Sequence, residues 1–133
     1  MRNNPREDLL NCHRRHVRAW EQKNLDQLRE LYVEDAVIFN TEPPAQFLNF
    51  KTFENTLHQY FSRIGEMSIF TSNIRIEVNG RMAWVSSQYL REYRLTGRAF
   101  RQSGRWTEVY KRAEGNWRIV HLHSSLDPVG TGV

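Results

Sequence analysis

Residues 105–125 read RWTEVYKRAEGNWRIVHLHSS, and this stretch decides the fold. Two runs rich in aromatic and β-branched residues, Trp106–Arg112 and Trp117–His123, flank the triplet Glu114-Gly115-Asn116. Gly and Asn tolerate the positive φ that a tight hairpin turn requires. The stretch therefore predicts two long antiparallel strands joined by a short turn.

The alternating pattern begins well before this hairpin, at Met67. Ile74–Val78 alternates strictly between apolar and polar residues, and the Asn79-Gly80 pair that follows is a strong hairpin signal. Met82–Leu95 is predicted to be the long return strand. We expect Arg98–Gly104 to join that strand to the closing hairpin, so that the second half of the chain is an antiparallel meander.

Helical periodicity occupies the first half. Asn4-Pro5-Arg6-Glu7 predicts a helix start, because Asn caps, Pro fits the first helical position, and Glu can reach back to the cap. This helix should run to about Gln22. We expect a second, short helix from Asn24 to Tyr32 and a third from Lys51 to Ile64, capped by Gly65.

One short strand, Val37–Phe39, is expected among the helices, ended by the proline pair Pro43-Pro44. Helices followed by a run of antiparallel strands predict an α+β fold. A chain of 133 residues, 39% of them hydrophobic, is large enough for one domain with its own core. We expect a single domain over residues 1–133, ordered from about 5 to 126, with a loose tail at Val129–Val133.

The charge of the chain is +4, and its arginines are scattered along the sequence. Nucleic-acid binders gather basic residues with interleaved aromatics, so we expect no nucleic-acid partner and favour an anionic small molecule.

Cys12 is the only cysteine, which excludes an intramolecular disulfide and a cysteine-based zinc site. The polar first residues lack the apolar core of a signal peptide, and no run approaches bilayer length; the expectation is a cytoplasmic protein without a membrane partner.

Four segments resemble SnoaL-like proteins of the nuclear transport factor 2-like superfamily. They are HVRAWEQKNLDQLRELY (16–32), EDAVIFNTEPP (34–44), KTFENTLHQYF (51–61) and the closing hairpin. The last strand is also similar to that of the association (hub) domain of calcium/calmodulin-dependent protein kinase II. The resemblance implies a cone-shaped fold, in which N-terminal helices pack on a strongly curved antiparallel sheet and a ligand pocket lies between the two.

Proteins of this kind isomerise steroids, cyclise polyketides, hydrolyse epoxides or only bind ligands, and the fold does not choose among these. In the steroid isomerases the position matching Asn40 is the base aspartate, and His16 matches a tyrosine. An Asn cannot accept the substrate proton, so that mechanism is not expected here. The arginines of the hub pocket match Ser86, Glu108 and Ser124, so the hub's acidic ligands are not expected either.

Glu108 is the main catalytic candidate, because it shares a strand face with Trp106 and Tyr110. Burial against aromatics would raise the pKa of its carboxyl, which suits a general acid or base near neutral pH. His16 or Asn40 is its expected hydrogen-bonding partner, and both are candidate catalytic residues. The alternative is that Glu108 pairs with a neighbouring arginine (Arg91, Arg94 or Arg105). The ligand-binding residues that the resemblance implies are Trp20, Tyr32, Phe39, Glu42, Glu54, Ser86, Tyr110 and Ser124.

His121 and His123 have the spacing of two metal ligands on a strand, but no third ligand is near in the sequence, so we expect no metal and no cofactor. By simple alternation Trp117 and Ile119 share a face with these histidines. Large residues on an outer sheet face need covering, which predicts a homodimer through that face.

The sequence thus predicts a small-molecule pocket protein. It leaves open an acid–base isomerase, cyclase or hydrolase acting on an apolar or carbonyl substrate, and a non-catalytic ligand-binding or association module.

Overall fold

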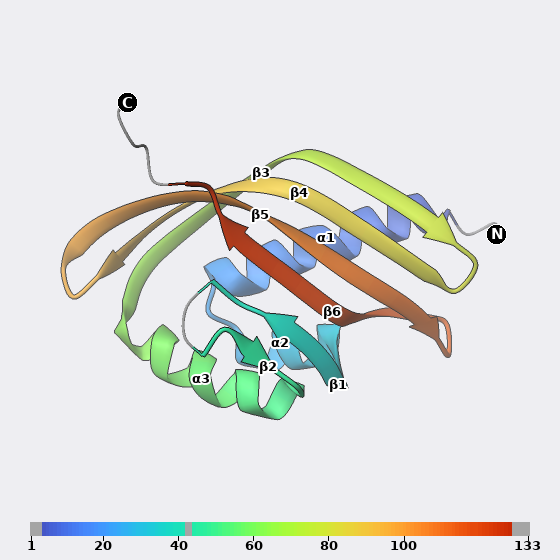
Figure 1. Cartoon of the computed structure of the whole chain (residues 1–133), viewed down its shortest axis with the longest axis horizontal. Helices are drawn as coiled ribbons and strands as arrows, with labels where there is room; N and C mark the ends of the chain where they lie inside the picture. The colour runs from blue at the N-terminus through green and yellow to red at the C-terminus, as the bar shows by residue number, and fades with distance from the viewer. Residues whose placement is uncertain (1–3, 42–43, 129–133) are drawn as a thin grey trace.

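The computed structural model describes residues 4–41 and 44–128, in which helices lie on one face of a curved sheet (Figure 1). The helices are α1 (Pro5–Glu21), α2 (Leu25–Leu31) and α3 (Phe50–Arg63). The strands are β1 (Tyr32–Phe39), β2 (Gln46–Phe47), β3 (Ile64–Asn79), β4 (Met82–Leu95), β5 (Arg98–Ala113) and β6 (Asn116–Leu126). This is the predicted α+β fold; the expected loose tail at Val129–Val133 lies outside the described residues.

Asparagine caps begin all three described helices. The Asn4 side chain accepts a hydrogen bond from the Glu7 amide, which confirms the predicted start of α1. Asn24 caps α2 in the same way. Each cap satisfies one of the amide groups that a first helical turn leaves without an intrahelical partner.

The predicted cap at Gly65 is wrong. Ile64 already has extended geometry, with ψ of 131°, and α3 passes directly into β3. The Lys23 ammonium donates to the carbonyls of Ile64 and Gly65, at 2.9 and 2.7 Å. A side chain from the α1–α2 connection therefore binds the carbonyl oxygens at this junction, and no glycine turn is needed.

The strand order is β2-β1-β6-β5-β4-β3. β3 to β6 form the predicted antiparallel meander, but β1 pairs with β6 in parallel, so the sheet is mixed rather than antiparallel. Arg98–Gly104 is part of β5, not a joining segment as expected, and Leu95 pairs directly with Arg98. Gly97, with φ of 82°, makes this tight turn possible.

A β-bulge at Val120 changes which residues of β6 face the helices. Tyr110 pairs with Ile119 and Val109 pairs with His121, which leaves Val120 as the extra residue. Before the bulge, Trp117 and Ile119 are buried in the protein core; after it, His121 and His123 lie on the opposite face. The expectation that these four residues share one outer face is wrong, because simple alternation does not survive a bulge.

The core lies between the helices and the sheet and is rich in aromatic rings. Trp20 contacts Phe53, Phe61 and Trp106, with ring centroids 5.6 to 6.5 Å apart.

Among the described residues, none of the helices has the length and apolar character needed to cross a bilayer.

Candidate functional site

A cluster of titratable side chains lies in the core, centred on Glu108. The carboxylate is fully buried on β5 and faces α1. His13 Nδ1 lies 3.1 Å and His16 Nδ1 2.8 Å from Glu108 Oε2, and the Tyr110 hydroxyl donates to Oε1 at 2.8 Å. No arginine reaches Glu108 among the interactions of the described residues, so its partners are histidines and a tyrosine.

The two histidines are neighbours on one face of α1, three residues apart. His13 is 1% exposed, and its Nε2 lies 3.1 Å from the Thr71 hydroxyl on β3. The sequence analysis did not name His13 as a site residue. The available signal was the His-x-x-His spacing, which points two imidazoles to the same side of a helix.

The second nitrogen of His16 contacts two further aromatic residues. Its Nε2 lies 2.7 Å from the Tyr32 hydroxyl and accepts a 3.2 Å hydrogen bond from Trp20 Nε1. An indole N–H can only donate, so this contact requires a lone pair on Nε2. The imidazole proton is therefore on Nδ1, where it is donated to Glu108.

These contacts decide the charge of Glu108. Burial raises the pKa of the carboxyl, but its contacts with His16 and His13 outweigh burial and lower the pKa to about 2. The expectation of a raised pKa is therefore wrong, because a buried carboxylate that accepts several hydrogen bonds stays ionised. Burial and the charge of Glu108 raise the pKa of Tyr32 and Tyr110 well above the ordinary value, which keeps both hydroxyls as donors.

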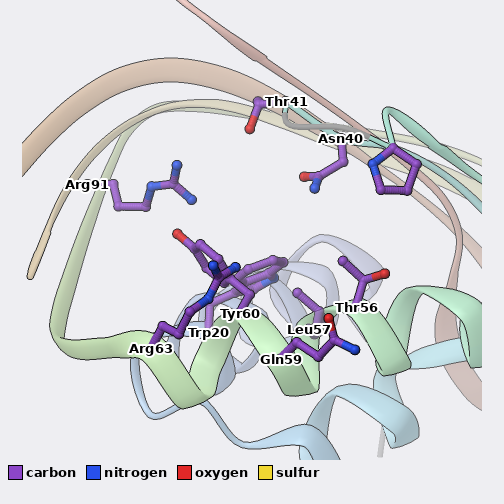
Figure 2. Close-up of a pocket in the computed structure, with 10 residues that line it drawn as sticks. Trp20, Asn40, Thr41, Thr56, Leu57, Gln59, Tyr60, Arg63 and Arg91 are labelled. Carbon is purple, nitrogen blue, oxygen red and sulfur yellow. The ribbon is translucent and has the colours of Figure 1, made fainter. Parts of the chain in front are cut away.

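A cavity of about 220 Å³ lies between α3 and the sheet (Figure 2). Arg91 and Asn40 reach into it from the sheet side, above the rings of Trp20 and Tyr60. The described residues that line it are Trp20, Asn40, Thr41, Pro44, Thr56, Leu57, Gln59, Tyr60, Arg63 and Arg91. A small adjoining hollow of about 20 Å³ shares Trp20, Asn40, Thr41 and Arg91 and extends to Tyr89, Trp106 and Ser124.

Trp20 separates the cavity from the Glu108 cluster. Its ring lines the cavity, while its N–H closes the cluster at His16. Neither His16 nor Glu108 is exposed to any measurable extent. Among the described residues that line the cavity, none is Asp, Glu, His or Cys. The indole ring of Trp20 thus lies between the polar side chains of the cavity and the titratable side chains of the Glu108 cluster.

The structure brings the predicted site residues to several different places. Trp20 and Asn40 line the cavity, Ser124 lines the adjoining hollow, and Tyr32 and Tyr110 belong to the Glu108 cluster. Asn40 makes no hydrogen bond to Glu108 among the described interactions; its backbone amide donates to Ala45.

Three predicted ligand-binding residues lie outside the cavity, the adjoining hollow and the Glu108 cluster. Phe39 is on the outer sheet face, with ring contacts to His121 and His123 at 5.0 and 5.3 Å. Glu54 forms an ion pair with Arg29 beside a separate depression. Ser86 points away from the helices, since the buried residues of β4 are its neighbours Val85 and Ser87. Glu42 lies outside the described residues.

Two arginines of the cavity were not predicted as ligand-binding residues. Arg63 ends α3, and Arg91 lies between Tyr89 and Tyr93 on the inward face of β4. The signal for Arg91 was present in the sequence: Ser87, Tyr89, Arg91 and Tyr93 alternate, so an arginine shares the face of two large aromatics. No group of three or more potential metal ligands occurs among the described residues.

Comparison with known proteins agrees with this fold. The profile of the SnoaL-like domain matches residues 9–129. The chain belongs to the SnoaL-like family. No curated protein sequence matched it.

Solved structures of similar fold have low sequence identity to this SnoaL-like chain. A candidate scytalone dehydratase from Novosphingobium aromaticivorans superposes with a TM-score of 0.84 at 18% identity, over 93% of this chain and 85% of the other. A nuclear transport factor 2-like superfamily protein from Salmonella enterica gives 0.83 at 17%, over 96% and 93%. LinA gives 0.82 at 14%, over 96% and 90%. At such identities the likeness concerns the fold alone.

Proposed function

We propose that this SnoaL-like protein binds a small organic molecule in the cavity between α3 and the sheet. The cavity combines the ring of Trp20 and the apolar side chain of Leu57 with a few polar groups, among them the Asn40 amide. This mixture is typical of ligand sites, where apolar walls supply the contact area and a few polar groups set orientation.

One observation favours binding over turnover. The described cavity walls carry no carboxylate, imidazole or thiol, and the acid–base cluster behind Trp20 is fully buried. Glu108, with a pKa of about 2, stays ionised at neutral pH and is a poor proton donor there. A ligand in the cavity would therefore meet hydrogen-bond donors and aromatic faces before any proton-transfer group.

Filling the cavity tests the proposal. Thr56 on α3 lines the cavity and is half-buried, whereas its neighbour Asn55 is exposed and does not line it. A small-molecule library is screened against the wild type by ligand-observed NMR, and the hits are titrated by calorimetry. Thr56→Phe should abolish binding of the hits, and Asn55→Phe should leave their affinity within about twofold.

Two results would count against the proposal. Hits that bind Thr56→Phe as tightly as the wild type occupy some other surface. A library that yields no hit with the wild type, although the protein is folded by circular dichroism, would remove the support for a binding function.

Acid–base catalysis by Glu108, His16 and Asn40 is a second candidate. The observation in its favour is the hydrogen bond between Glu108 and His16, because a carboxylate that orients a histidine is a common arrangement in general-base catalysis. In this arrangement His16 Nε2 would be the base, Glu108 would position it, and Asn40 in the cavity wall would hold the substrate. Proton transfer would require the Trp20 ring to move aside.

Deuterium exchange distinguishes the two candidates. Bound ligands with a C–H group next to a carbonyl are incubated in D₂O, and loss of that proton signal is followed by NMR. A catalyst should exchange the proton, and Glu108→Gln should remove most of the exchange while the ligand still binds. Exchange at the buffer rate with wild-type protein would leave binding as the function.

We include a homodimer in the proposal, with a corrected interface. The outer face of the sheet carries Phe39, His121 and His123 and, in the neighbouring strands, Val109 and Trp84. Trp84 is 40% exposed in the single chain. Burial of this large apolar side chain by a second subunit would be favourable, which supports a dimer through this face. The alternative of an association module, which rests on the resemblance to the kinase hub, would use the same face.

A cytoplasmic location stays a prediction of the sequence.

A further inference from the structure

The cavity between α3 and the sheet holds two cations and no anion among its described lining residues. Arg91 enters from β4 and Arg63 from the end of α3. Neither arginine forms an ion pair with a carboxylate of the described residues, whereas Arg29, Arg101 and Arg105 each do. A site with uncompensated positive charge favours an anionic ligand.

Arg91 has a hydrogen-bond donor to spare. Its Nη2 donates to Gln102, and its guanidinium lies 5.1 Å from the centroid of the Tyr93 ring. These two contacts hold the side chain in one orientation. Its Nε is buried and has no hydrogen-bond partner among the described residues. A buried donor without a partner is unfavourable. Because Nε is closed to water, a carboxylate oxygen of a ligand would accept from it only after a small shift of the guanidinium toward the cavity.

The guanidinium geometry favours a carboxylate over a simple halide or a neutral group. Nε and one Nη of an arginine form a planar fork that matches the two oxygens of a carboxylate. Arg63 is exposed at the cavity mouth. Its charge would attract the ligand from solution, but it would contribute less to the affinity than Arg91, because water and salt screen an exposed charge.

The size and walls of the cavity define the rest of the ligand. Its volume of about 220 Å³ is below the range of roughly 300–1,000 Å³ that is usual for drug-sized ligands. The ring of Trp20 and the side chain of Leu57 give it an apolar wall. These dimensions suit a single ring rather than a fused polycycle.

We infer that the cavity binds a small monocyclic carboxylate, with its ring against Trp20 and its carboxylate on the guanidinium of Arg91. This inference rests on the proposed function, because it names the ligand class of the same cavity. It goes further because it assigns the preference for carboxylates over neutral ligands to one residue, Arg91.

Calorimetric titration with matched compounds tests the assignment. The probes are benzoate and cyclohexanecarboxylate, each compared with its carboxamide, which has the same shape without the charge. Wild-type protein should bind the carboxylates at least about tenfold more tightly than the amides, because a charge-assisted hydrogen bond is roughly twice as strong as a neutral one.

Three arginine variants locate the effect. Arg91→Gln should weaken carboxylate binding by about ten- to a hundredfold and weaken amide binding much less. Arg91→Lys keeps the charge but lacks the Nε donor, so its loss should be intermediate. The control is Arg101→Gln: Arg101 is exposed on β5, lies outside the cavity and pairs with Glu92 at 3.6 Å, so the change should have no effect.

The outcomes separate this inference from the proposed function. Equal affinity for carboxylates and amides, or unchanged carboxylate affinity in both Arg91 variants, would overturn the inference and leave a cavity for neutral ligands. Binding of neutral rings such as indole, abolished by Thr56→Phe, with no carboxylate binding would do the same. If no ring compound of either charge binds, the inference fails, and the proposed function fails with it only if the screened library also yields no hit.

Discussion

The indole nitrogen of Trp20 lies 3.2 Å from Nε2 of His16, so one side chain lines the cavity and closes the buried cluster. Trp20→Phe would keep a ring in place and remove this hydrogen bond. We expect a loss of about 1 kcal/mol in the free energy of unfolding, because His16 retains its contact with Tyr32. Urea unfolding measures this loss. Equal stability of Trp20→Phe and wild type would show that the hydrogen bond contributes nothing.

The acid stability of the protein should depend on Glu108. Its pKa is lowered from 4.5 to about 2 in the folded protein, so the carboxylate stabilises the fold above pH 4.5. Protonation should remove this contribution as the pH falls from about 5 to 2, on the order of 3 kcal/mol in all. Unfolding measured across that range should therefore show a steep loss of stability in the wild type.

Glu108→Gln should flatten that pH dependence and lower stability at neutral pH. Glu92→Gln, which changes a half-exposed carboxylate, is the matched control and should keep the wild-type profile. A Glu108→Gln variant with the full pH dependence would mean that other carboxyl groups cause the acid sensitivity.

Gly104 on β5 has no room for a side chain. A Cβ there would lie 2.2 Å from the Ser125 carbonyl oxygen and 2.7 Å from the Tyr89 hydroxyl. Gly104→Ala should destabilise the protein by about 1–3 kcal/mol, and it should displace Tyr89 from the hollow beside the cavity. Gly65→Ala has an ordinary 3.4 Å contact and should be nearly neutral. Thermal unfolding of the two variants compares them directly, and equal melting temperatures would contradict the prediction.

Metal ions should not stabilise the protein. His121 and His123 are 6.3 Å apart between ring centroids, but no third potential ligand joins them among the described residues. A ligand that binds only the folded state raises the melting temperature, so stoichiometric zinc or magnesium should leave it unchanged. A rise of several degrees, absent from His123→Ala, would reveal a metal site.

The proposed dimer should depend on Trp84. Trp84→Arg places a charge in the centre of the outer face and should shift the protein to monomer in sedimentation experiments. Leu48→Arg changes an even more exposed residue outside the sheet and should leave the dimer intact. A wild-type protein that sediments as a monomer at tens of micromolar would contradict the dimer.

Local signals predicted the parts of the fold that local chemistry controls. The Asn4 and Asn24 caps and the Asn79-Gly80 turn lie where the sequence placed them, because a cap or turn depends on a few adjacent residues. The parallel pairing of β1 with β6 was missed, because it depends on contacts between segments far apart in the chain.

The site was predicted less completely for the same reason. Glu108 was placed correctly in the interior, but its pKa depends on His13 and His16, which approach it from a different element. Ser86 was chosen where Ser87 is the buried residue, since a register error of one position exchanges the two faces of a strand. Arg91 was considered only as a partner for Glu108, and its position in the cavity became visible with the packing of α3.

The parallel pairing of β1 with β6 bears on how the chain folds. Glu108 is separated by 95 residues from His13 and by 92 from His16. The pairing partner of β1 is β6, which is the last strand in the sequence. Such long-range contacts slow folding, because a large loop must close before they form. During synthesis α1 and β1 would be made long before their partners, so their apolar faces would stay uncovered until β6 emerged from the ribosome.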